Sequence, residues 1–155
     1  MVQDAMRVGL GTGSTAAWMV RRIGERVQNE GLRIKGVPTS TRTAQLGREV
    51  GIEVVSLDQA GWLDLTIDGA DEFDGELNLI KGGGGALLRE KVVAQASRRN
   101  IIIVDESKFV PKLGTGWALP IEVIPFARFT EERFLSDLGG AVTLRINDDG
   151  TPFST

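Results

Sequence analysis

The chain has 155 residues, 41% of them apolar, and its 18 basic and 21 acidic side chains give a net charge of −3. This length supports one good core with room for a small second unit. The sequence has no basic run, so nucleic acid and anionic membrane surfaces are poor candidates as partners. No apolar run approaches the roughly 20 residues of a membrane span, and residues 1–7 do not form a signal peptide. We therefore expect a cytoplasmic protein.

The sequence contains neither cysteine nor histidine. Without cysteine there are no disulfides, thiolate metal sites or cysteine nucleophiles. Without histidine there are no Ser-His or Cys-His arrangements, and the usual zinc sites are excluded as well. The commonest general base near neutral pH is also missing. Any acid–base chemistry must therefore use carboxylates and lysine.

Strand-like and helix-like segments alternate along the first two thirds of the chain. Helical patterns begin at Thr15, after the capping sequence Thr39-Ser40-Thr41, and at Ala86. The predicted strands are residues 6–10, 32–37, 52–57, 63–67 and 100–104. The last of these, NIIIV, is continuously apolar, as is typical of a parallel strand buried on both faces. The alternation predicts an α/β fold with an open, mostly parallel, Rossmann-like sheet and helices on both of its faces.

The pattern changes after Lys108, where prolines and glycines interrupt a linker-like stretch. We expect a catalytic domain over residues 1–118 and an incomplete, smaller α+β domain over 119–155. The smaller domain should contain strands at 121–124 and 141–146, a helix at 130–138 and a hairpin turn at 147–150. Both ends of the chain are abrupt. We therefore expect a fragment of a longer protein, with reduced stability and an exposed sheet face.

Four polar loops each follow a predicted strand directly. They are GTGST (11–15), PTST (38–41), DGADE (68–72) and DESK (105–108). In an open α/β sheet, ligands bind outside the carboxyl ends of the strands. A parallel sheet brings all four loops to that edge, and this convergence is the best argument from sequence for a binding site.

The first glycine-rich loop, GLGTGST, fits neither common nucleotide fingerprint. Its glycines at 9, 11 and 13 do not match G-x-G-x-x-G, and no lysine follows the last of them. Backbone N–H groups at Gly13 and the hydroxyls of Thr12, Ser14 and Thr15 are suited to a single phosphate. The alternative is plain N-capping of the following helix by Ser14 or Thr15.

Residues 67–91 combine the DGADE carboxylates, an isolated Lys81, four consecutive glycines and a helix carrying Glu90. Carboxylates exchange protons, a lysine stabilises developing negative charge, and free N–H groups at a helix start hold phosphate. The stretch therefore predicts proton transfer on a small anionic substrate. The alternative is a surface acidic turn followed by a glycine linker. However, each glycine costs a regular element roughly 0.5–1 kcal/mol relative to alanine, so such a run needs a reason.

Several residues in this region have competing interpretations. Glu90 shares its helix face with small residues and could be reached by a ligand, but Arg89-Glu90-Lys91 could also be a solvated charge pattern. Asp71, Glu72 and Asp74 could bind Mg²⁺, although the nearby Lys81 argues against a metal. The three tryptophans are most simply core or rim residues; they are Trp18, Trp62 and Trp117.

Taken together, GLGTGSTA, DGADE, KGGGGALLREK, D-x-SK and LPIEVIPF closely resemble the type A ribose-5-phosphate isomerase family over nearly the whole chain. The resemblance implies conversion of an aldose phosphate to its 2-ketose through an enediolate, within the pentose phosphate pathway. It also implies a homodimer or tetramer and neither metal nor organic cofactor. Members of that family have a helix with a basic residue before the first strand, and they continue beyond Thr155; this chain has neither feature.

The resemblance also implies roles for individual residues. Glu90 would be the base that moves a proton between C1 and C2, assisted by Asp68 and Lys81, while Asp71 would hold sugar hydroxyls. The implied contacts to the sugar phosphate come from Thr12, Gly13, Ser14, Thr15, Gly69, Ala70, Gly82, Gly83, Gly84 and Lys108. A different class of function, a non-catalytic sugar-phosphate sensor, would need the phosphate loop but not both Glu90 and Lys81. Their joint presence favours the enzyme.

Overall fold

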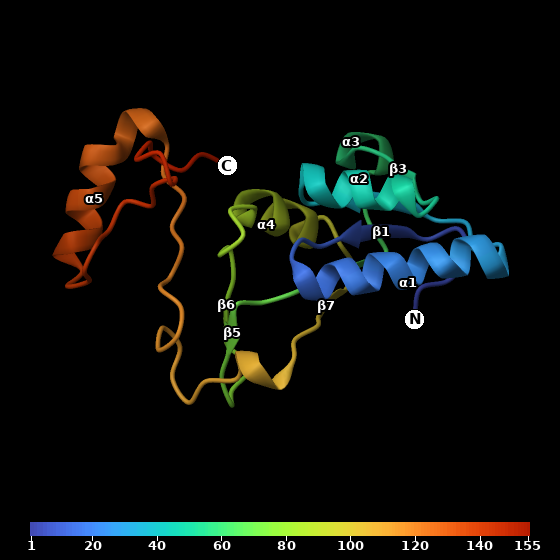
Figure 1. The fold of residues 1–155 in the computed structure, drawn as a ribbon, viewed down its shortest axis with the longest axis horizontal. Coiled ribbons are helices and arrows are strands. Elements are labelled where there is room, and N and C mark those ends of the chain that lie inside the picture. The colour runs from blue at the N-terminus through green and yellow to red at the C-terminus, as the bar shows by residue number, and fades with distance from the viewer. The chain divides into compact units, whose positions relative to one another are not determined.

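The structure, a computed structural model, describes residues 1–155 and divides them into two compact units, Met1–Pro120 and Ile121–Thr155. The first unit contains all the strands and four of the five α-helices (Figure 1). None of the helices is both long enough and apolar enough to cross a membrane.

The first unit is built on a five-stranded parallel sheet with the order β3-β2-β1-β4-β7. The strands are β1 (Arg7–Leu10), β2 (Lys35–Pro38), β3 (Glu53–Val54), β4 (Leu65–Asp68) and β7 (Asn100–Ile102). The chain first moves from β1 outward to β3, then returns to β4 on the other side of β1. The predicted open parallel sheet is therefore confirmed, and β1 and β4 lie next to each other at its centre.

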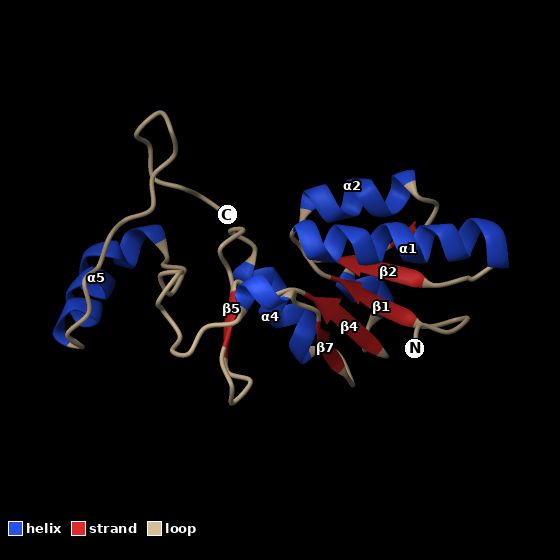
Figure 2. Ribbon diagram, turned by 60° about the horizontal axis from the view of Figure 1, so that its bottom comes forward, coloured by secondary structure: helices blue, strands red, loops and turns tan.

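Helices cover both faces of this sheet, as the alternation of elements predicts. Figure 2 shows α1 (Ser14–Glu30) and α2 (Thr41–Glu49) on one face. The short α3 (Leu57–Ala60) and α4 (Leu87–Gln95) pack against the other face, through Ala60 and Val93. This arrangement follows from right-handed crossovers, since the direction of travel along the sheet reverses after β3.

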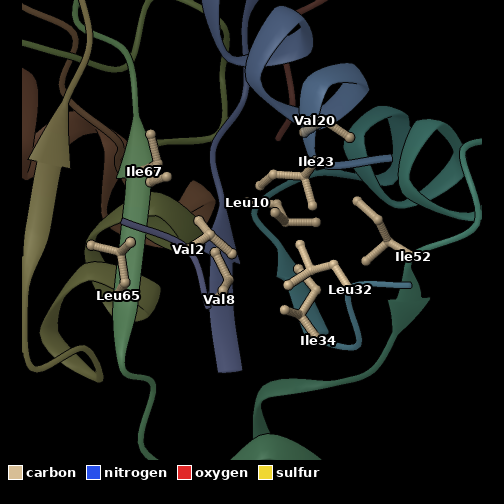
Figure 3. Packing of buried hydrophobic residues seen from close by; sticks show 10 residues of the cluster. All are labelled: Val2, Val8, Leu10, Val20, Ile23, Leu32, Ile34, Ile52, Leu65 and Ile67. Atoms are coloured by element: carbon tan, nitrogen blue, oxygen red, sulfur yellow. The ribbon is translucent and has the colours of Figure 1, made fainter. Parts of the chain in front are cut away.

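The larger core cluster lies between α1 and the sheet (Figure 3). Val8 and Leu10 of β1 are fully buried there, against Val20 and Ile23 of α1. A smaller cluster on the opposite face is formed by Val37, Ala60, Leu63 and Val93. Alternate residues of the central strands face these two clusters, so both faces of the sheet are apolar.

Two of the predicted strands differ from the structure. Residues 52–57 form only a two-residue strand, because Ser56 and Gln59 make a capping box that starts α3 at Leu57. The segment 100–104 is not buried on both faces: β7 is an edge strand, and Ile101 and Ile102 are half-buried. The apolar run therefore predicts a strand correctly, but the predicted burial on both faces is wrong.

The first unit also contains a small antiparallel hairpin that the sequence pattern does not reveal. Its strands are β5 (Glu72–Phe73) and β6 (Leu79–Ile80). Asp74 holds the turn by accepting hydrogen bonds from the N–H groups of Glu76 and Asn78. The hairpin begins inside DGADE and ends immediately before Lys81.

The second unit contains η2 (Pro125–Ala127), α5 (Arg128–Asp137) and a turn at Asn147–Gly150, whose ends bond to each other. The predicted helix and turn are confirmed. The predicted strands at 121–124 and 141–146 are wrong, since only a single bridge joins Ile146 to Pro152. A strand needs a partner along its length, and none pairs with these segments.

Candidate functional site

The candidate site lies at the carboxyl ends of β1 and β4, where the helices that follow neighbouring strands depart to opposite faces. Such a switch point opens a crevice at the edge of the sheet. GTGST follows β1 and DGADE begins at the end of β4, so the topology brings these two predicted loops together.

Asp68, the last residue of β4, fixes the two loops to each other. The residue is 3% exposed, and its Oδ1 accepts hydrogen bonds from Thr12 N (3.1 Å) and Gly69 N (2.8 Å). A Cβ at Gly11 would lie 2.1 Å from the same oxygen. Glycine is therefore required at residue 11 so that the β1 loop can approach the carboxylate.

Lys81 connects Asp68 with Glu90. Its Nζ lies 3.0 Å from Asp68 Oδ2 and 3.2 Å from Glu90 Oε2, and it also donates to the carbonyl oxygen of Gly69. The β5–β6 hairpin places the lysine here, directly after Ile80. One ammonium thus lies between two buried carboxylates.

Glu90 is 5% exposed although it lies on a helix between Arg89 and Lys91. The interpretation as a solvated charge pattern is therefore wrong. Burial raises the pKa of Glu90, the nearby Asp68 carboxylate raises it further, and Lys81 opposes both effects. The closest charged group to Oε2 is the Lys81 ammonium, at 3.2 Å.

The glycine run is folded against Asp71 and against the first loop. Asp71 Oδ2 accepts a hydrogen bond of 2.8 Å from Gly83 N. A Cβ at Gly84 would contact Thr12 Cγ2 at 4.0 Å, which places the glycines beside GTGST. The backbone is left-handed at Gly82 and Gly85, where φ is 101° and 74°. The run is an ordered turn before α4 and not a linker.

The three carboxylates considered for Mg²⁺ have separate partners. Asp71 holds Gly83, Asp74 holds the hairpin turn, and Glu72 accepts hydrogen bonds from the N–H groups of Gly114, Gly116 and Trp117. No group of three or more acidic side chains is arranged to hold a metal ion. The arrangement gives the metal alternative no support.

The GTGST loop is anchored by hydroxyl groups of the residue that follows β2 and of the first turn of α2. Thr12 Oγ1 lies 2.7 Å from Thr39 Oγ1, and Thr43 Oγ1 donates to the carbonyl oxygen of Gly11. The N-cap of α1 is Gly13, with φ at 117°, and no side chain caps this helix. Plain N-capping by Ser14 or Thr15 is therefore wrong.

The remaining residues that are predicted to contact the sugar phosphate lie outside the hydrogen-bond network around Asp68 and Lys81. Ser14 and Thr15 occupy the first turn of α1, and Ala70 lies between Gly69 and Asp71. Lys108 ends η1 (Glu106–Lys108) after β7, at the same edge of the sheet. Trp18, Trp62 and, to a lesser extent, Trp117 are exposed, so none of the three belongs to the core.

Sequence reasoning missed three residues that shape the site. Thr39 and Thr43 anchor the first loop, and Glu72 organises residues 114–117. The sequence predicts PTST as a loop at this edge of the sheet, but nothing in it indicates which hydroxyl contacts Thr12. The partners of Glu72 are backbone groups more than 40 residues away, and such groups leave no signal in the sequence.

These features define a class of protein: an α/β protein with a buried acid–base cluster at the switch point of its sheet, beside two glycine-rich turns that present N–H groups. The family model of ribose 5-phosphate isomerase A (phosphoriboisomerase A) matches residues 35–155. The chain belongs to this family.

Individual relatives agree with this assignment. The chain is 62% identical over 162 aligned positions to ribose-5-phosphate isomerase A of Ruegeria pomeroyi, covering 100% of this chain and 61% of the relative. The solved isomerase A of Methanocaldococcus jannaschii has a TM-score of 0.92 at 42% identity, covering 98% of this chain and 68% of that one. A D-ribose-5-phosphate isomerase in complex with phospho-erythronic acid has a TM-score of 0.92 at 40% identity, covering 98% and 67%. The chain thus spans about three fifths of the length of its curated relatives.

Proposed function

We propose that the chain interconverts ribose 5-phosphate and ribulose 5-phosphate through an enediolate, with Glu90 as the base. The observation that carries this proposal is the row Glu90–Lys81–Asp68, in which one half-buried ammonium lies within 3.2 Å of two buried carboxylates. In a chain without histidine or cysteine, this is the acid–base group that the fold buries at its switch point.

The reaction needs one group that removes a proton from C2 of the aldose and returns it to C1 of the enediolate. A pKa raised by burial makes the Glu90 carboxylate a stronger base than an exposed one. Lys81 would stabilise the negative charge that develops on the sugar oxygens, while Asp68 holds the ammonium in place. Asp71 would accept hydrogen bonds from sugar hydroxyls, beside the backbone of Gly69 and Ala70.

The phosphate is expected where the start of α1 meets the glycine run. Gly13, Ser14 and Thr15 lie at a helix N-terminus whose N–H groups no side chain caps, and Gly84 lies beside Thr12. Gly82 and Lys108 would add donors from the same edge of the sheet, and Gly83, whose N–H already donates to Asp71, would line the phosphate site. The relative solved with phospho-erythronic acid supports a phosphorylated, anionic ligand. We also propose that the protein is cytoplasmic and forms a homodimer or tetramer. It would act in the pentose phosphate pathway and would need no cofactor.

The test is formation of ketopentose from ribose 5-phosphate by the parent chain and by Glu90→Gln, which keeps the shape and removes the basicity. We expect the rate to fall by roughly 10²–10⁴-fold, the usual effect of losing a general base. Exchange of the C2 hydrogen with deuterated water should fall in parallel, and substrate binding far less. Glu49→Gln makes the same replacement of a carboxylate by an amide at an exposed residue of α2. It is the matched control and should keep the parent rate.

Two results would contradict the proposal. If Glu90→Gln turns over near the parent rate, the base is another group, and Asp68 or Asp71 would be tested next. If the parent binds the sugar phosphate without converting it, the chain is a sensor or binding module.

A further inference from the structure

Glu72, the last residue of DGADE, has no role in the proton transfer described above. It is nevertheless 3% exposed, and its carboxylate is fully engaged. Oε1 accepts hydrogen bonds from Gly116 N and Trp117 N, both at 2.6 Å, and Oε2 accepts one from Gly114 N at 2.7 Å. Three short N–H···O hydrogen bonds to one carboxylate are expected when an ionised side chain holds a loop in place.

The segment that Glu72 holds places an indole ring on the glycine run. A Cβ at Gly83 would lie 2.7 Å from Trp117 Cε2 and Cζ2, and 2.8 Å from Asp71 Oδ1. The Trp117 ring and the Asp71 carboxylate therefore both lie against the Cβ side of Gly83, whose N–H also donates to Asp71 at 2.8 Å. The glycine at residue 83 leaves room for this close approach.

Burial raises the pKa of Glu72, but the three N–H donors lower it by more, so its pKa lies below its ordinary value. The side chain is therefore a carboxylate at neutral pH. Hydrogen bonds to an ionised group are stronger than neutral ones. The ionised Glu72 thus holds residues 114–117 in one arrangement.

From these contacts we propose that Glu72 is a positioning residue that acts through Trp117 to fix Gly83, and with it the glycine run that binds phosphate. This inference rests on the proposed function for the assignment of the glycine run to the sugar phosphate. Neither Glu72 nor Trp117 touches the reacting carbons in this role. Their loss therefore weakens anion binding and raises KM, and changes kcat much less.

The experiment uses the full chain in a Trp18→Phe/Trp62→Phe background, in which Trp117 is the single tryptophan. Both replaced rings are largely exposed, so the background should fold as the parent does. The variants are Glu72→Gln, Trp117→Ala, Trp117→Phe and the double variant Glu72→Gln/Trp117→Ala. Glu76→Gln, an exposed residue of the same hairpin, makes the same change of charge and is the control. The measurements are Kd for inorganic phosphate, KM and kcat for ribose 5-phosphate, and acrylamide quenching of Trp117.

We expect Glu72→Gln and Trp117→Ala each to raise Kd for phosphate and KM about tenfold, the effect of one lost charge-assisted hydrogen bond. Because both act through Gly83, the double variant should be about as weak as either single variant. Trp117→Phe, which keeps a ring against Gly83, should remain within about twofold of the parent. Glu72→Gln should also make Trp117 more accessible to acrylamide, whereas Glu76→Gln should change nothing. A role limited to stability would lower the melting temperature without this pattern.

The inference is overturned if the two single effects multiply in the double variant, if kcat falls as much as KM rises, or if phosphate does not bind the parent. Its failure is distinguishable from failure of the proposed function. Loss of phosphate affinity in Glu72→Gln without any isomerisation by the parent supports the positioning role and refutes the activity. Isomerisation with unchanged phosphate affinity in Glu72→Gln does the reverse.

Discussion

Glu90 is a carboxylate held where its charged form is disfavoured, and this has a consequence for stability. Its pKa is raised above the ordinary value of 4.5, chiefly by burial and then by Asp68. From pH 4.5 up to that raised value, the folded state binds more protons than the unfolded state. Stability must therefore fall as pH rises through this window, by about 1.4 kcal/mol for each unit of elevation.

The variant Glu90→Gln removes this penalty, because the amide does not ionise. We expect its melting temperature to rise relative to the parent between pH 4 and pH 8, whatever the difference between the two proteins at pH 4. Thermal unfolding of both proteins at several pH values measures the change. A difference that is independent of pH would mean that Glu90 ionises in the folded chain as easily as in the unfolded one.

At this scale the sequence shows which residue types are available but only part of how they are paired. Glu90, Lys81 and Asp68 could be selected because a chain without histidine leaves carboxylates and lysine for acid–base work. The burial of Glu90 could not be predicted, because its charged neighbours on the helix resemble a solvated pattern. The contact of Trp117 with Gly83 depends on a loop held by Glu72, and no local pattern encodes that loop.

At the scale of elements, the close approach of the β1 and β4 loops depends on Gly11. A Cβ at this residue would lie 2.5 Å from the Asp68 Cα, so backbone as well as side chain would have to shift. We expect Gly11→Ala to reduce the free energy of unfolding by about 1–3 kcal/mol, as overpacking does, and to lower activity by displacing Asp68.

Gly75→Ala is the control for this prediction, since its Cβ would meet no atom within 4 Å and its φ is not positive. It should remain within about 0.5 kcal/mol of the parent. Urea denaturation of the two variants measures both values. Equal stability of Gly11→Ala and the parent would show that the loops can separate at no cost.

At the element scale, segments with a clear boundary or a long pattern were predictable. α1 follows from helical periodicity over 17 residues, α2 from its cap at Ser40, and the four-residue strands β1 and β4 from apolar runs that end directly at a polar loop. The hairpin of β5 and β6 escaped because each strand has two residues, too few to show any alternation. α3 could have been found from the S-x-x-Q spacing of Ser56 and Gln59, which makes its capping box.

At the scale of the whole chain, the two units differ in what holds them together. Residues of both apolar clusters belong to Met1–Pro120, whereas no residue of Ile121–Thr155 is buried. The second unit also exposes large apolar side chains, among them Phe126, Phe129 and Phe134. The sequence could mark the change in pattern after Lys108. It could not show that segments with strand-like composition would find no partner.

Since burial of apolar surface is the main force that favours folding, residues 121–155 should contribute little to the stability of the first unit. We expect a chain ending at Pro120 to unfold cooperatively within about 3 °C of the parent, because a change of 1 kcal/mol shifts the melting temperature of such a domain by about 4 °C.

Phosphate affinity should be unchanged, since Thr12, Asp68, Lys81, Glu90 and Trp117 all lie in the first unit. Removal of the exposed phenylalanines should also reduce aggregation. Calorimetry and phosphate titration of the two chains decide the matter: a melting temperature lowered by about 10 °C, or a loss of phosphate binding, would show that the second unit supports the site.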